Sequence, residues 1–89
     1  MTAMTDREHK TKRLRFRAWH RGTRELDLLI GRFADAHLET MDDDQLTRFE
    51  VFMERPDPDV YDWLVKGLPV PDEDHNDIID LIFDFHKLS

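Results

Sequence analysis

The sequence contains no cysteine, and glycine and serine are scarce. Without thiols the chain cannot form disulfides, thiolate zinc sites, iron–sulfur clusters or a cysteine nucleophile. Its three glycines, Gly22, Gly31 and Gly67, stand too far apart to form a phosphate-binding loop or a dinucleotide-binding fingerprint. The one serine, Ser89, lies at the C-terminus, which argues against a Ser–His–Asp triad. These absences remove the commonest catalytic and cofactor-binding motifs.

Patterns typical of metal sites and of membrane spans are missing as well. No two of the five histidines lie four residues apart, so we expect no metal site built on local spacing. No apolar run approaches the roughly 20 residues that cross a bilayer, so we expect no membrane insertion. Asp6 and Glu8 stand near the N-terminus without an apolar segment, which argues against a secretory signal.

Charge is abundant and unevenly distributed. The 89 residues carry a formal net charge of −7, yet residues 1–24 hold eight basic and two acidic residues. The first 24 residues therefore sum to +6 and residues 25–89 to −13, which predicts a positive end and a negative body. A basic end suits nucleic acid, a membrane surface or an acidic protein. The acidic remainder disfavours nucleic acid because it repels phosphates within a Debye length of about 8 Å.

Apolar residues recur with helical spacing, and runs of β-branched residues are absent, so we expect an all-α fold. The clearest stripe joins Leu26, Leu29, Ile30, Phe33 and Ala34. With their capping residues, the predicted helices span residues 6–20, 26–37, 42–56, 57–66 and 72–87. The connections are short, which predicts a single compact antiparallel bundle of about five short helices.

Local signals mark where these helices begin and end. Thr5 with Glu8, and Asp42 with Gln45, have the spacing of capping boxes. Gly22 is the expected stop of the first helix, because glycine readily adopts the left-handed conformation that follows a helix end.

The last two helices have further signals. Asp57 before Pro58 is typical of an N-cap followed by a first-turn proline. The acidic run 72–77 lacks the glycine and the glutamate that a calcium loop requires at fixed positions. We therefore interpret this run as the negative first turn of the last helix.

Residues 19–25, Trp-His-Arg-Gly-Thr-Arg-Glu, place four ionisable groups and a glycine between two predicted helices. One interpretation is an ordinary glycine-terminated corner with charges facing solvent. The other is an exposed corner that recognises a partner. The composition of the segment fits both interpretations.

The segment 21–27, Arg-Gly-Thr-Arg-Glu-Leu-Asp, resembles the RGxxE motif of the succinate dehydrogenase FAD assembly factor family. The pattern Asp-Pro-Asp-Val-Tyr-Asp-Trp-Leu at 57–64, about 30 residues later, is also similar to the family pattern. So are Phe33 and the Leu46-x-x-Phe49-Glu pattern. The resemblance covers residues 12–83, with Thr23 where some members have methionine. It assigns 12–89 to the family's helical domain and leaves 1–11 as a flexible arm or the start of the first helix.

This resemblance implies a function as well as a five-helix fold. The family consists of assembly factors, not enzymes, that bind the flavoprotein subunit of succinate dehydrogenase and promote its covalent flavinylation. It implies that FAD is carried by the flavoprotein and is not bound tightly by this chain. The partner would be that subunit, with the fumarate reductase flavoprotein a further possibility, and the free chain would be a monomer. The location would be the bacterial cytoplasm, or the mitochondrial matrix for a mature eukaryotic form.

The resemblance also implies which residues touch the partner. Arg21, Gly22 and Glu25 correspond to the contact motif. His20, Arg17 and Arg24 adjoin this motif, and we expect them to complete the partner-binding surface. Asp59, Tyr61 and Trp63 form a possible secondary surface, although Tyr61 and Trp63 suit core packing as well.

Two other classes of function remain open from the sequence. The +6 N-terminal segment, with Phe16 and Trp19 among its basic residues, is compatible with a helical nucleic-acid-binding module. The antitoxin-like label that some members of this family have carried is a second alternative.

Overall fold

The computed structural model describes residues 5–87, and all regular secondary structure there is helical. The elements are α1 (Asp6–Ala18), α2 (Arg24–His37), the 3-10 helix η1 (Leu38–Thr40), α3 (Asp43–Met53), α4 (Asp57–Leu64) and α5 (Asp77–His86). The expected all-α fold is confirmed for this part of the chain. None of these helices is long and apolar enough to span a bilayer. Residues 1–4 of the predicted arm lie outside the described residues.

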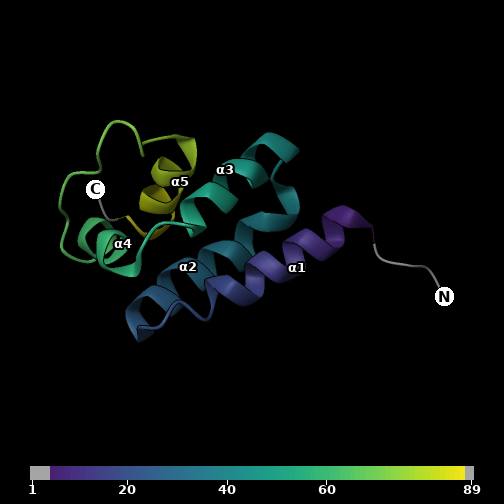
Figure 1. The fold of residues 1–89 in the computed structure, drawn as a ribbon, viewed down its shortest axis with the longest axis horizontal. Coiled ribbons are helices and arrows are strands. Elements are labelled where there is room, and N and C mark those ends of the chain that lie inside the picture. The colour runs from purple at the N-terminus through teal and green to yellow at the C-terminus, as the bar shows by residue number, and fades with distance from the viewer. Residues whose placement is uncertain (1–4, 88–89) are drawn as a thin grey trace.

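The helices pack around α2. Figure 1 shows α1 and α2 side by side, α3 above α2 in this view, and α4 and α5 at the end of the molecule farthest from the N-terminus. Phe33 of α2 and Phe49 of α3 are fully buried, with ring centroids 5.9 Å apart. Each such side chain stabilises the fold by roughly 1.5–3 kcal/mol. The other core residues come from all five α-helices, η1 and Met41: Leu14, Ala18, Leu26, Ile30, Ala34, Leu38, Met41, Leu46, Phe52, Met53, Val60, Trp63, Leu64, Ile78, Ile79 and Ile82.

The two predicted capping boxes are both present. The Thr5 hydroxyl accepts a hydrogen bond from the Glu8 amide, and the Asp42 carboxylate accepts one from the Gln45 amide. In both boxes the second side chain bonds back to the amide of the first, so two orphan donors are satisfied at each helix start. The prediction that Asp57 caps α4 is wrong, because Asp57 is the first residue of the helix and Pro56 occupies the N-cap position.

The last helix begins five residues later than predicted. Residues 72–74 form a turn, in which the Pro71 carbonyl accepts hydrogen bonds from the amides of Asp74 and His75. Asn76 is the N-cap of α5, and its side-chain oxygen accepts from the amides of Ile78 and Ile79. The acidic run resembled a helical first turn in charge, but the Asn76 side chain fixes where the helix starts.

Asp77, the first residue of α5, ties this helix to α3. Its carboxylate accepts hydrogen bonds from Arg48 Nε at 2.6 Å and Nη2 at 3.0 Å. The Arg48 hydrogen bonds lower the pKa of Asp77, because they favour the ionised carboxylate. Two side chains distant in sequence therefore join the start of α5 to the middle of α3.

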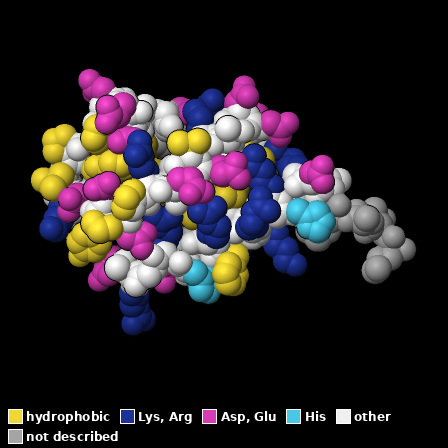
Figure 2. Space-filling model, viewed as in Figure 1, with side chains coloured by type: hydrophobic (Ala, Val, Ile, Leu, Met, Phe, Trp, Pro, Cys, Tyr) yellow, Lys and Arg dark blue, Asp and Glu magenta, His cyan; other side chains and the backbone are white. Residues whose placement is uncertain are grey.

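The basic first helix does not form a separate positive end, contrary to the prediction. It lies along the acidic body, and within residues 5–87 all its cations except Lys12 pair with carboxylates of α2, η1 and α3 or with Glu54, which follows α3. The pairs are Arg7–Asp43, Lys10–Glu50, Arg13–Glu50, Arg15–Asp35, Arg15–Glu39 and Arg17–Glu54, at 2.8–4.0 Å. Figure 2 shows basic and acidic side chains intermixed over this region. Each exposed pair contributes at most about 1 kcal/mol, but together they balance the charge of α1 within the chain.

Trp19, which follows α1, packs directly against Gly31 of α2. A Cβ at Gly31 would overlap the indole, with Trp19 Cε3 only 2.8 Å away. The indole Nε1 donates to the Asp35 carboxylate at 3.2 Å. This contact could not be predicted from the sequence, because a glycine inside a helix does not identify what approaches it. Gly31 thus lets the end of α1 lie close to α2.

Replacing Gly31 with alanine should therefore destabilise the chain. In most helix interiors this change stabilises by about 0.5–1 kcal/mol, but here the methyl group must displace the indole, which we expect to destabilise by about 1–3 kcal/mol. Urea unfolding measures the effect. In a Trp19→Ala background Gly31→Ala should be neutral or stabilising, because the obstructing ring is gone. A Gly31→Ala chain as stable as the unmodified one would contradict this packing.

Candidate functional site

Two of the three predicted motif residues, Arg21 and Gly22, lie in the bend between α1 and α2, residues 19–23, here called the corner. The third, Glu25, lies in the first turn of α2. α1 ends at Ala18 with Trp19 as its C-cap, so Gly22 is not the residue that stops the helix. Gly22 instead lies within the bend, at φ +116°. A side chain there would be strained, because only glycine adopts such positive φ values readily. The conformation of the corner, and not the end of α1, requires this glycine.

Arg21 points into the molecule, which corrects the prediction of a solvent-facing side chain. Only 8% of its side chain is exposed. Its Nη1 donates to the Met53 carbonyl at 2.7 Å, and its Nη2 to the Arg55 carbonyl at 2.8 Å. Nη2 also lies 2.8 Å from Asp57 Oδ1. The guanidinium therefore binds the end of α3, the loop that follows and the start of α4 together.

One carboxylate holds the backbone of the corner, and a second lies against Gly22. The Arg21 amide donates to Asp27 Oδ1 at 2.6 Å, which ties the bend to the first turn of α2. A Cβ atom added to Gly22 would lie only 3.1 Å from Asp57 Oδ2. A side chain at position 22 would therefore press on the carboxylate that pairs with Arg21. Both motif residues are constrained from inside the molecule by Asp27 and Asp57, neither of which we predicted as a site residue.

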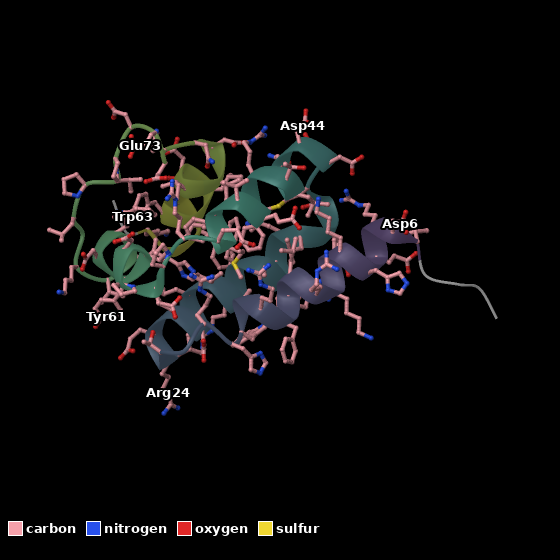
Figure 3. The ribbon with its side chains drawn as sticks, viewed as in Figure 1. Asp6, Arg24, Asp44, Tyr61, Trp63 and Glu73 are labelled. Atoms are coloured by element: carbon pink, nitrogen blue, oxygen red, sulfur yellow. The ribbon has the colours of Figure 1, made fainter. Side chains whose placement is uncertain are left out.

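Other predicted contact residues face outward. Arg24 and Glu25, at the start of α2, are exposed, and Figure 3 shows Arg24 extending away from the bundle. His20 is exposed and stacks on Phe16, with ring centroids 4.1 Å apart. Arg17 pairs with Glu54 at 3.2 Å, so part of its charge is already compensated within the chain. The corner and the adjoining turns of α1 and α2 thus present one cation, one anion and an aromatic pair around Gly22.

The possible secondary surface divides between surface and core. Asp59 is exposed, and Tyr61 is partly buried against the core. Trp63 is only 6% exposed, so it is a packing residue and cannot form a contact surface. Figure 3 shows Trp63 on the side of α4 nearer to α5. A cavity of about 250 Å³ between the corner and α4 is lined by Tyr61 together with Thr23, Asp57, Pro58, Asp62 and Lys66.

The chemistry of this site is that of a binding surface. Among residues 5–87 no group of three His, Cys, Asp or Glu side chains is placed to hold a metal ion. The corner offers a backbone bend held rigidly from inside and a few exposed charges. Such an arrangement suits close approach by another protein, because the ordering of the bend precedes binding.

The sequence contains a signal for only some of the internal contacts of Arg21. Asp57 belongs to a motif that carried the family resemblance, and an arginine–aspartate pair between two motifs is a natural inference. The carbonyls of Met53 and Arg55 carry no sequence signal at all, because every residue has one.

Comparison with known proteins shows which family this chain resembles. A family model described as "flavinator of succinate dehydrogenase" matches residues 12–86. The chain is 50% identical over 64 residues to the FAD assembly factor SdhE of Acetobacter pasteurianus. The aligned region covers 72% of this chain and 59% of that protein.

Two eukaryotic proteins, both named succinate dehydrogenase assembly factor 2, mitochondrial, are also similar. The one from Dictyostelium discoideum is 32% identical over 75 residues, covering 84% of this chain and 53% of that protein. The one from Meyerozyma guilliermondii is 41% identical over 69 residues, covering 74% and 51%. The matched regions thus span little more than half of these relatives. The family resemblance predicted from residues 12–83 is confirmed.

Removing the Arg21 side chain should destabilise the fold, because it leaves two carbonyls and a carboxylate without their donor. Hydrogen bonds to a charged group contribute about 1.5–3 kcal/mol each, and Asp57 remains partly solvated, so we expect Arg21→Ala to lose roughly 2 kcal/mol in urea unfolding. Arg24→Ala, in the same motif but exposed, should change stability by less than about 0.5 kcal/mol. Equal stabilities for the two variants would show that Arg21 does not anchor the corner.

Proposed function

This chain belongs to the family of flavinators of succinate dehydrogenase, and on that basis we propose that it is an assembly factor for the dehydrogenase flavoprotein. It binds the flavoprotein subunit and promotes covalent attachment of FAD. The observation that carries the proposal is the motif Arg21-Gly22-x-x-Glu25, which spans the corner and the first turn of α2 within the matched residues 12–86.

The residues of the motif act differently in this proposal. Gly22 leaves the backbone of the corner open to a partner, because no side chain covers it. Glu25 offers an exposed carboxylate for a cation of the flavoprotein, and Arg24 a cation for an acidic group. Arg21 acts indirectly: its internal contacts keep Gly22 and Glu25 in place.

We assign the bond-forming chemistry and the cofactor to the flavoprotein. The chain supplies no serine or cysteine nucleophile among residues 5–87 and no glycine-rich phosphate loop. Its net charge of −7 disfavours tight binding of a pyrophosphate. In this proposal the chain is not an enzyme: it holds the flavoprotein in an arrangement in which the flavin linkage forms, and FAD stays with the partner.

The finer points of the proposal follow from the relatives. Their names refer to succinate dehydrogenase. We extend the proposal to flavinylation of a fumarate reductase flavoprotein. We place the chain where the flavoprotein matures, in the bacterial cytoplasm or the mitochondrial matrix, and we expect the free chain to be monomeric. The nucleic-acid alternative loses its main support, because the cations of α1 pair with carboxylates of the body.

A charge-removing substitution at Glu25 tests the proposal. Glu25→Gln keeps the size of the side chain and should slow covalent flavinylation of the flavoprotein subunit at least about tenfold, which corresponds to 1.4 kcal/mol of lost interaction. The readout is flavin fluorescence that stays with the denatured subunit on a gel. Melting should stay close to that of the unmodified chain, because Glu25 is exposed.

Glu73 provides the matched control. It is an exposed glutamate in the loop before α5, far from the labelled Arg24 in Figure 3. Glu73→Gln should flavinylate at the rate of the unmodified chain. An unmodified chain that neither binds the flavoprotein nor raises its flavin content would overturn the proposed function itself.

A further inference from the structure

A groove runs beside the corner, between α2 and the end of α4. It encloses about 420 Å³, and its walls are made by Leu28 and Leu29 of α2 with Leu64 and Val65 at the end of α4. Glu25 and Arg32, also on α2, complete the lining. Positions 25, 28, 29 and 32 lie on one face of a helix, so the groove follows the axis of α2.

The apolar wall of this groove is open to solvent in part. Val65 is 40% exposed, whereas Leu64 beside it is buried and Leu29 is partly buried against the core. Leu68, which follows α4 outside the groove lining, is 48% exposed. Figure 2 shows hydrophobic side chains gathering at the end of the molecule where Figure 1 places α4. Single exposed apolar side chains are common, but several that gather beside a groove are typical of a contact site.

Charges of opposite sign stand at the two ends of the groove. Glu25 and Arg32 are seven residues apart on α2, or about 10 Å along the helix axis. Neither residue forms an ion pair within residues 5–87, whereas most cations of α1 do. An occupant of the groove would therefore find one unpaired charge at each end and an apolar floor between them.

We propose that this groove binds an apolar segment of the flavoprotein subunit, flanked by a basic residue that faces Glu25 and an acidic residue that faces Arg32. The inference rests on the proposed function and extends its contact surface along α2. Glu25 belongs both to the motif and to the groove, so one partner can cover the two without a gap. A second copy of this chain in the groove would instead cover Glu25 and withhold it from the flavoprotein.

Two exposed valines allow a matched test. Val65 lines the groove, whereas Val51 lies on α3, outside the groove, and is 57% exposed. Val65→Lys should weaken binding to the purified flavoprotein subunit at least about tenfold by calorimetry, because it places an ammonium group against the apolar segment. Val51→Lys should bind within about twofold of the unmodified chain, and both variants should melt normally because both sites are exposed.

A second variant, at a site on α2, tests the groove without changing any residue at the end of α4. Arg32→Glu reverses the charge at the far end of the groove on an exposed helical position. It should weaken binding by a similar factor, because like charges would then face each other across the interface.

The outcomes separate the groove from the proposed function. If the unmodified chain binds and Glu25→Gln weakens it, while Val65→Lys and Arg32→Glu bind normally, the groove inference is wrong and the proposed function stands. If the unmodified chain does not bind the subunit, the proposed function fails and the groove inference fails with it. If Val65→Lys changes only the sedimentation of the free chain, the occupant is a second copy, which contradicts the inference.

Discussion

The side chain of Arg21 is the contact on which the arrangement of the corner depends. A buried guanidinium is tolerated only where its charge and its donors are matched. Here the charge and the Nη1 and Nη2 donors are matched by the carbonyls of Met53 and Arg55 and by the carboxylate of Asp57, while the buried Nε has no hydrogen-bond partner among the described residues. Met53 ends α3, and the carbonyl end of a helix favours a cation. One side chain therefore stabilises a helix end and joins the first two helices to the next two.

This internal role divides the motif into inward and outward parts. Arg21 and Gly22 are constrained from inside the molecule. Asp57 pairs with the Arg21 side chain and leaves little room for a side chain at position 22, and Asp27 accepts a hydrogen bond from the Arg21 amide. Glu25 is free to meet a partner and also begins the groove along α2. Loss of function on changing Arg21 would therefore not identify a contact residue, whereas loss on changing Glu25 would.

Sequence reasoning worked wherever the decisive signal was local. The capping boxes at Thr5 and Asp42, and the apolar stripes of α2 and α3, are short patterns with one structural solution. It failed where a distant residue decides the outcome. The acidic run 72–77 has the composition of a first turn, yet Asn76 sets the start of α5. Arg21 looked exposed because its acceptors lie more than 30 positions away.

The charge of the chain shows the same limit. The totals of +6 and −13 are correct as sums, but a sum does not say whether the two regions touch. Packing of α1 along α2 and α3 brings them together and leaves few cations unpaired. The surface that we propose for a partner is therefore the corner with Glu25 and the apolar groove, and not the basic helix.

A double-mutant cycle between Arg21 and Asp57 tests the central claim most directly. Free energies of unfolding for Arg21→Ala, Asp57→Ala and the double variant give the coupling between the two side chains. If the pair holds the corner, the coupling should exceed about 1 kcal/mol, and the second substitution should cause little further loss once the first is present. Effects that add to within about 0.3 kcal/mol would show that the two side chains act independently and would contradict the account.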